Sequence, residues 1–307
     1  SKVLTSAPNT QYIVKSSPAR KKILIEQNVN HHTYFTARTA NNIYTLDFGK
    51  DFPTLIGVGL ASQLHLSDQW ASFYSSQLKT IYIKNLDQQS INFDIKLQNK
   101  INPFFIPSLV MLSEQILIYS DINQKGNIGI IKFERQTNKF TPLIVSDSHE
   151  EKIELCLSDK YIYVGRFGIN HSKLGSKITQ YDRSNFSIDN GKVIYESNMD
   201  DFGNIICNNN QEKVYFVKNI SKDSFTFRTE VAELNLSDQK VEIISDLNYV
   251  TNIIDIDGRL LIPHIGKFYI LSGRSNLTAD SLEAKEAKET KEAKETKEAK
   301  ETKEAKE

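Results

Sequence analysis

The feature that most constrains this chain is a repeat of about 45 residues that runs through its first 282 positions. Short runs of alternating apolar residues recur at a regular interval, each ahead of a polar turn. They begin at Ile43, Ile81, Ile128, Ile178, Val231 and Phe268. The five steps between them span 225 residues, an average of 45. A period of this length is typical of stacked supersecondary units, each of which buries its apolar face against its neighbours.

A second series of segments, about fifteen residues earlier in each repeat, predicts β-hairpins. Each segment is a strand, a polar turn of two to four residues and another strand. These segments are 64–75, 110–120, 155–165, 205–217 and 253–264. A further strand follows the first series at 91–97, 140–145, 193–197 and 241–245. Each unit is therefore predicted to be a four-stranded antiparallel meander, and no amphipathic helix of three turns is evident in this part of the chain.

A sheet of four short strands cannot bury both of its faces alone, so we expect the units to repeat around an axis. The sequence predicts an all-β chain, folded over residues 1–282 as a six-bladed β-propeller of four-stranded antiparallel blades. The last run, 268–273, has no clear fourth strand after it, whereas the strand at 11–17 has no unit of its own. We therefore expect residues 11–17 to be the outer strand of the last blade and to close the ring. A pair of β-sandwiches and a β-solenoid are the rival architectures, and regular four-stranded units fit neither well.

Three of the hairpins carry a family resemblance. The segments "LSDQWASFY", "LSEQILIY" and "LSDKYIYV", each followed by a strand like "IYIKNL", resemble the repeat of TolB-like and WD-repeat-like bacterial β-propellers. The resemblance covers residues 11–273 in pattern only, and of the usual turn sequence only Asp257-Gly258 is retained. It implies a propeller architecture and assigns no catalytic residue. Nothing in the sequence matches the separate N-terminal domain of TolB, so the resemblance is to the repeat and not to that protein.

The C-terminal tract, 283–307, is built from Glu-Ala-Lys and Glu-Thr-Lys triplets. The triplet period places like charges three residues apart, and the opposite charges four residues apart run in the weaker Lys-to-Glu order. The tract has no apolar stripe with which to pack. We expect a helical or disordered low-complexity tail that acts as a spacer. A tether for the propeller and an inert repeat expansion both stay open.

The charge balance argues against nucleic acid as the main partner. The chain has 38 basic and 38 acidic residues; the tail holds 8 Lys and 9 Glu, which leaves 30 against 29 in the body. The body therefore has a net charge of +1 and lacks the excess of basic residues that binding to nucleic acid requires. No apolar run approaches the roughly 20 residues of a membrane span. The chain begins at Ser1 without a Met or a signal-peptide pattern, so we expect a processed or trimmed form and favour export, periplasmic or extracellular, slightly over the cytoplasm.

The residue types that carry chemistry form no recognisable motif. The six histidines lack metal-ligand spacing, and there is no Gly-x-Ser-x-Gly elbow or phosphate-binding glycine loop. Cys156 and Cys207 occupy nearly equivalent positions in adjacent blades. Inner strands of different blades usually lie too far apart for the Cα separation of about 4.4–6.8 Å that a disulfide needs, so we expect two buried thiols. The sequence therefore assigns no catalytic residue, no metal site and no cofactor.

The candidate binding residues gather on one predicted face. The long loops 166–176 and 218–228 connect the second and third strands of adjacent blades, and the loops 146–151 and 197–203 open on the same face. A mixed-charge cluster with an exposed aromatic is typical of a protein-binding surface, although merely solvated loops remain the alternative. The candidates are His149, Arg166, Asn170, His171, Lys173, Asp200, Asp201, Lys222, Asp223 and Phe225.

These observations predict a non-enzymatic β-propeller binding module, a protein-interaction scaffold that binds an unidentified protein partner through loops on one face. Two alternatives stay open because a fold alone does not define a function. One is a metal-assisted hydrolase or lyase with its site at the mouth of the propeller channel. The other is a propeller that binds a carbohydrate or another small ligand. Convergence of three or more carboxylate or imidazole groups at the channel mouth would favour the enzyme.

Overall fold

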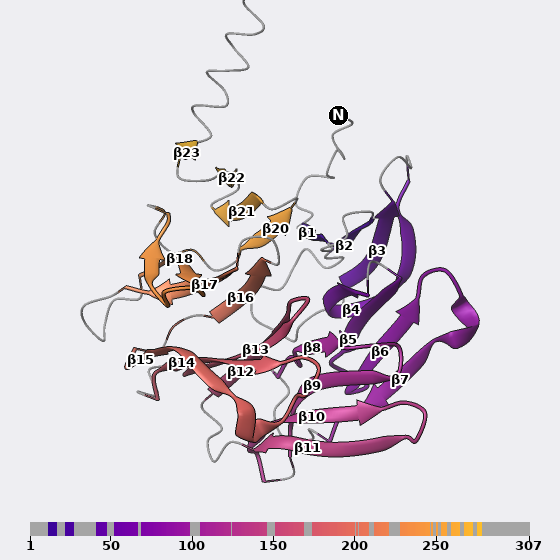
Figure 1. Cartoon of the computed structure of the whole chain (residues 1–307). Helices are drawn as coiled ribbons and strands as arrows, with labels where there is room; N and C mark the ends of the chain where they lie inside the picture. Colours follow the sequence, from indigo (N-terminus) through magenta and orange to yellow (C-terminus); the bar gives the residue numbers. More distant parts are fainter. Residues whose placement is uncertain are drawn as a thin grey trace, which may run out of the picture.

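The fold consists of antiparallel β-strands, and within each sheet the strands that are consecutive in the sequence pair with each other (Figure 1). No α-helix occurs in the described part of the chain, nor does any helix there have the length and apolar character to cross a membrane. The structure is a computed structural model that describes residues 12–16, 22–27, 41–47, 52–66, 69–98, 105–123, 125–145, 151–168, 174–199, 201, 203–208, 212–220, 228–245, 247, 250, 253–256, 259–264, 267–272 and 275–277.

The first seven strands form one sheet that is divided within a single long strand. Residues Thr54–Gly59 of this strand pair with the strand before it, whereas Leu60–His65 pair with the strand after it. The sheet therefore contains two four-stranded groups that share one strand. Group I is β1 (Tyr12–Ser16), β2 (Lys22–Gln27), β3 (Asn41–Asp47) and the first half of β4 (Thr54–His65). Group II is the second half of β4 with β5 (Trp70–Ser75), β6 (Thr80–Asn85) and β7 (Phe93–Lys96), and the short 3-10 helix η1 (Gln89–Ile91) precedes β7.

The remaining strands form separate four-stranded antiparallel sheets. Group III is β8 (Leu109–Met111), β9 (Ile116–Ile122), β10 (Ile128–Glu134) and β11 (Lys139–Val145). Group IV is β12 (Glu151–Leu157), β13 (Tyr161–Gly168), β14 (Ser176–Asp182) and β15 (Lys192–Ser197), with the 3-10 helix η2 (Ile188–Asn190) before β15. Group V is β16 (Gly203–Asn208), β17 (Lys213–Asn219), β18 (Thr229–Asn235) and β19 (Val241–Ile243). Group VI is β20 (Ile254–Ile256), β21 (Arg259–His264), β22 (Lys267–Ser272) and β23 (Ser275–Leu277).

The predicted repeat of 45 residues is confirmed as a repeat of strand position. Every run of the first series lies on the third strand of its group, namely β3, β6, β10, β14, β18 and β22. The predicted hairpins are the first and second strands of groups II to VI. The predicted fourth strands are β7, β11, β15 and β19. Four-stranded antiparallel units are thus the building blocks of the described chain.

The predicted place of the N-terminal strand is wrong. β1 pairs along its whole length with β2, from Tyr12 opposite Gln27 to Ser16 opposite Ile23. The last group already has a fourth strand, because β23 pairs with β22. This strand, "SNL", escapes recognition because it is short and lacks apolar alternation, whereas β1 lies a few residues from β2 and closes a hairpin at small entropic cost. The first and last groups nevertheless meet, since Cα atoms of β1 and β20 approach within 8 Å (Figure 1).

Apolar side chains fill the spaces between consecutive groups. β17 shows the pattern: Val214 and Phe216 pack against residues of group IV, while Tyr215 and Val217 pack against the start of group VI. All four are buried. Because successive side chains of a strand point to opposite faces, a strand that lies between two packed layers is apolar at every position. The same alternation places a core between each pair of consecutive groups from I to VI.

Gly57 and Gly59, which the sequence shows as an isolated Gly-x-Gly, have a packing role in β4. A Cβ atom at Gly57 would lie 2.2 Å from Cζ of Phe73, which real structures do not tolerate. The missing side chains let the Phe73 ring lie against β4 in the core between groups I and II. The tail, 283–307, lies outside the described residues.

Removal of β1 should destabilise the protein. Deletion of residues 1–18 would strip β2 of its ladder partner and leave it as an unpaired edge. We expect the Tm to fall by about 5 °C or more, since about 2 kcal/mol corresponds to a shift of roughly 4–8 °C in a chain of this size. Calorimetry would measure it, with deletion of residues 1–10 as the matched control. An unchanged Tm after the longer deletion would contradict the β1–β2 pairing.

Candidate protein-interaction surface

The structure describes two of the ten predicted binding residues, Arg166 and Asp201. Arg166 lies in β13, the strand that leads into the first long loop, and Asp201 lies in the connection between β15 and β16. The other eight lie outside the described residues: His149, Asn170, His171, Lys173, Asp200, Lys222, Asp223 and Phe225. The geometry of this surface is therefore defined by the strands and hydrogen bonds from which its loops emerge.

Each of the two long loops leaves a hairpin that is closed by a backbone hydrogen bond. In group IV, the N–H of Gly168 donates to the carbonyl of Gly175 at 3.0 Å, between β13 and β14. In group V, the N–H of Ile220 donates to the carbonyl of Arg228 at 2.8 Å, between β17 and β18. Both loops connect the second strand of a group to the third. They therefore emerge at the same end of two neighbouring groups.

Asp201 links the roots of both loops. Its carboxylate is fully buried, and its Oδ1 accepts a hydrogen bond from the backbone N–H of Asn219 at 2.9 Å. Its own backbone N–H donates to Oγ of Ser176 at 2.7 Å. Ser176 begins β14, after the first loop, and Asn219 ends β17, before the second. One buried residue thus fixes the bases of the two loops relative to each other.

Two further side chains complete the hydrogen bonding of this carboxylate. The hydroxyl of Tyr195 donates to Oδ2 of Asp201 at 2.6 Å. Lys218 donates to the Tyr195 hydroxyl, and its Nζ lies 3.8 Å from Oδ1 of Asp201. Nothing in the sequence marks Ser176, Tyr195 or Lys218 as members of this network, because they come from three different strands.

Burial controls the titration of this network. It raises the pKa of Asp201, although the positive charge of Lys218 and the hydrogen bond from Tyr195 oppose the shift. Burial also raises the pKa of Tyr195, and the neighbouring Asp201 adds to that effect. The tyrosine hydroxyl therefore keeps its proton over the physiological range and acts as a donor.

Asp201 and Arg166 differ from their predicted roles as exposed loop residues. The carboxylate of Asp201 is occupied by hydrogen bonds within the fold, because a backbone N–H group at a loop root needs an acceptor. Arg166 lies inside β13, ahead of the loop, and its Nη2 lies 2.8 Å from Oε2 of Glu151. Nε also donates to Oε2 at 3.1 Å and Nη2 donates to Oε1 at 2.9 Å, so both carboxylate oxygens are engaged. The Arg166 side chain remains about one-third exposed at 34 %.

The prediction of two free thiols is also wrong. Cys156 of β12 and Cys207 of β16 form a disulfide with a Cα separation of 5.9 Å, and neither remains free. The first strands of groups IV and V lie closer together here than the usual inter-blade spacing suggested. An adjacent contact shows the same approach, since the N–H of Ile205 in β16 donates to Oε2 of Glu154 in β12 at 2.9 Å. The two groups are therefore connected covalently as well as by packing.

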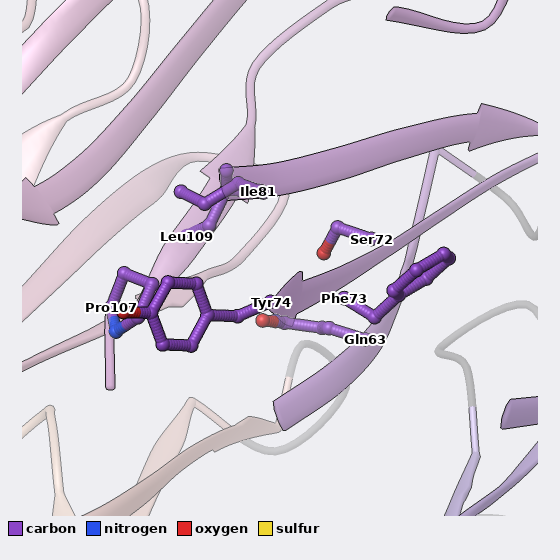
Figure 2. A pocket seen from close by; sticks show the side chains of 7 residues that line it. All are labelled: Gln63, Ser72, Phe73, Tyr74, Ile81, Pro107 and Leu109. Atoms are coloured by element: carbon purple, nitrogen blue, oxygen red, sulfur yellow. The ribbon is translucent and has the colours of Figure 1, made fainter. Parts of the chain in front are cut away.

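A small cavity between groups II and III offers no room for a substrate. Figure 2 shows the seven side chains that line it: Gln63, Ser72, Phe73, Tyr74, Ile81, Pro107 and Leu109. Its volume of about 10 Å³ is at the limit for one water molecule. The buried His65 shares a hydrogen bond of 2.8 Å with Oγ of Ser72. No group of three or more potential metal ligands is present among the residues that the structure describes.

Comparison with known proteins gave no relative: neither a protein-family model nor a curated protein matches this chain. The repeated four-stranded antiparallel sheets are compatible with a propeller-like all-β fold. The resemblance to TolB-like propellers therefore rests on the sequence pattern alone.

Loss of the disulfide should lower the free energy of unfolding. In the chain-entropy model, a cross-link over 51 residues stabilises the folded protein by about 4 kcal/mol. We expect a loss of that order in the double variant Cys156→Ala/Cys207→Ala, measured by urea denaturation without reductant. Reduced wild-type protein is the control and should lose a similar amount. A double variant as stable as oxidised wild type would contradict the cross-link.

The contribution of Asp201 to stability should depend on pH. Its pKa is raised in the folded protein, so the folded state holds the proton more tightly than the unfolded chain. The stability from this group is complete below the unfolded pKa of about 4 and is lost as the pH rises through the folded pKa. The advantage of wild type over Asp201→Asn should therefore shrink as the pH rises from about 4, as measured by urea denaturation. A constant difference would exclude this role, and the exposed Asp189→Asn controls for removal of a carboxylate.

Proposed function

We propose that this protein is a non-enzymatic β-propeller binding module, a protein-interaction scaffold. Its binding surface would be formed by the loop between β13 and β14 and the loop between β17 and β18. The observation that carries the proposal is the position of Asp201, whose hydrogen bonds join Ser176 at the root of one loop to Asn219 at the root of the other.

The arrangement of the sheets supports a six-bladed propeller. Groups I to VI follow one another along the chain, and a core of apolar residues lies between each consecutive pair. The approach of β1 to β20 brings the last group next to the first. A ring would then form without exchange of a strand, because each blade takes its four strands from a continuous stretch of the chain.

The rigidity of the loop bases supports a role in binding. Groups IV and V share a disulfide, a buried carboxylate network and an apolar core. Loops held on a fixed base lose less conformational entropy when a partner binds, which favours affinity. Loops longer than a hairpin requires are frequently functional. The residues that would contact the partner are the candidates on the loops: Asn170, His171, Lys173, Lys222, Asp223 and Phe225.

Three further candidates would border the loops. His149 and Asp200 fall in the neighbouring connections, and Arg166 is held against Glu151 in β13. We assign Arg166 to the rim of the surface, because its guanidinium already has a carboxylate partner. Asp201 belongs to the support and not to the contact surface.

The disulfide supports the exported location that the sequence slightly favours. Structural disulfides form and persist in oxidising compartments, the periplasm or the outside of the cell among them, and are rare in the cytosol. In that setting the tail, 283–307, would act as a spacer between the propeller and a surface or another domain.

Shortening the two loops tests the proposal. Asn-Gly, a favoured two-residue hairpin turn, would replace 169–174 and 221–227 and keep both closing hydrogen bonds. The variant should keep its Tm within a few degrees, because strands and inter-group cores are unchanged. It should lose proteins that wild type captures from its source organism, as measured by cross-linking and mass spectrometry.

The control changes a turn elsewhere in the molecule. Gln136→Ser/Thr137→Ser alters the exposed turn between β10 and β11, which connects a third strand to a fourth, and should leave capture intact. Capture of the same proteins by the variant without both loops would overturn the assignment of the surface.

A further inference from the structure

A cavity of about 220 Å³ lies between groups I and II, away from the loop roots of groups IV and V. It is lined by residues of β2, β3, β4 and β6 and by the segment that follows β6. At roughly 30 Å³ for each water molecule, the space holds about seven waters. That is enough for a small organic molecule of monosaccharide size.

The group I wall of this cavity presents a carboxylate already paired with a cation. Nζ of Lys22 lies 3.8 Å from Oδ1 of Asp47 and 3.3 Å from Oδ1 of Asp87. Asp47 lines the cavity together with Thr45. This wall therefore offers a carboxylate and a hydroxyl that can accept hydrogen bonds from a ligand, and Lys22, shared between Asp47 and Asp87, offsets part of the charge of Asp47.

The group II wall presents hydrogen-bond donors, of which Asn85 is the most buried at 6 % exposure. Oδ1 of Asn85 accepts the backbone N–H groups of Asp87 at 3.0 Å and Gln88 at 2.6 Å. The amide nitrogen must therefore lie on the other side, and it has no hydrogen bond within the described part of the chain. Oδ1 of Asn92 is likewise occupied, by the N–H of Asn85 at 2.8 Å, which leaves its amide nitrogen to donate. Both residues line the cavity, so water or a ligand within it can accept hydrogen bonds from these amide nitrogens.

Lys84 adds a positive charge to this wall. Its ammonium lies 5.8 Å from the centre of the Phe73 ring, and it forms no salt bridge with a carboxylate that the structure describes. Leu55, which is apolar yet 54 % exposed, and Leu86 provide an apolar surface beside these polar groups. A small number of polar groups beside an apolar wall is typical of sites that bind small ligands.

We propose that this cavity binds a small hydroxylated carboxylate, such as a sugar acid. The carboxylate would meet Lys84 and the amide nitrogens of Asn85 and Asn92, and the hydroxyls would donate to Asp47 and Thr45. The carbon skeleton would lie on Leu55. This site is independent of the loop surface proposed above.

Calorimetric titration of the full-length protein with D-glucuronate tests the proposal, with D-glucose and acetate as separate ligands. Lys84→Gln removes the charge and keeps the length of the side chain. Asn85→Asp keeps the oxygen that the Asp87 and Gln88 N–H groups need, yet replaces the donor with an acceptor. Asn92→Asp makes the same change at an exposed position, in case Asn85→Asp does not fold. The exposed Lys125→Gln is the control for loss of a lysine.

We expect D-glucuronate to bind at least tenfold more tightly than D-glucose or acetate. Binding should weaken at least tenfold in Lys84→Gln and in whichever Asn→Asp variant folds, and stay within twofold of wild type in Lys125→Gln. Absence of binding at 10 mM D-glucuronate (on the order of 3 kcal/mol of binding free energy) would overturn the proposal. Equal affinity for D-glucose, or unchanged binding in Lys84→Gln, would also overturn it.

Discussion

Burial of both faces of the four-stranded groups II to V is the constraint on which the rest of this structure depends. Residues of β17 alternate between two cores, with Phe216 in one and Tyr215 in the other, and no strand of this kind has a free face. Polar chemistry is consequently confined to the ends of the sheets and the spaces between them. The candidate surface and the cavity lie at such places, because a charged group within the layers would lack a partner.

Groups IV and V are connected by a disulfide, by hydrogen bonds and by an apolar core. The disulfide of Cys207 lies near the end of β16, and Asp201 lies just before its beginning. The first strand of group V is therefore held at both ends, with an apolar core beside it. The disulfide and the hydrogen bonds of Asp201 lie at opposite ends of β16. Together they resist both rotation of the two groups against each other and their separation. This geometry holds the bases of the two loops at a fixed position relative to each other.

Groups I and II meet in a different way, through the shared strand β4. Glycines in β4 admit the Phe73 ring, so the apolar core between these groups lies close to the strand. Beyond this core, most of the side chains that line the space between the two groups are polar. A cavity remains there, where Lys22 and Lys84 extend from opposite groups. A solvated site can therefore exist between two layers that are elsewhere closely packed, and its donors are fixed by the turn that Asn85 stabilises.

The sequence by itself determined the strands of groups II to V and their order, because alternation and turn composition are local properties. It placed every third strand correctly from Ile43 to Phe268 and identified the region of the long loops. Only the tertiary structure decided the partner of β1, the pairing of Cys156 with Cys207 and the burial of Asp201. Each of these depends on which residues from different repeats come within a few ångströms of one another. Sequence periodicity gives no information on the distances between residues of different repeats. The hydrogen-bond network of Asp201 and the cavity therefore form only when the sheets pack against each other.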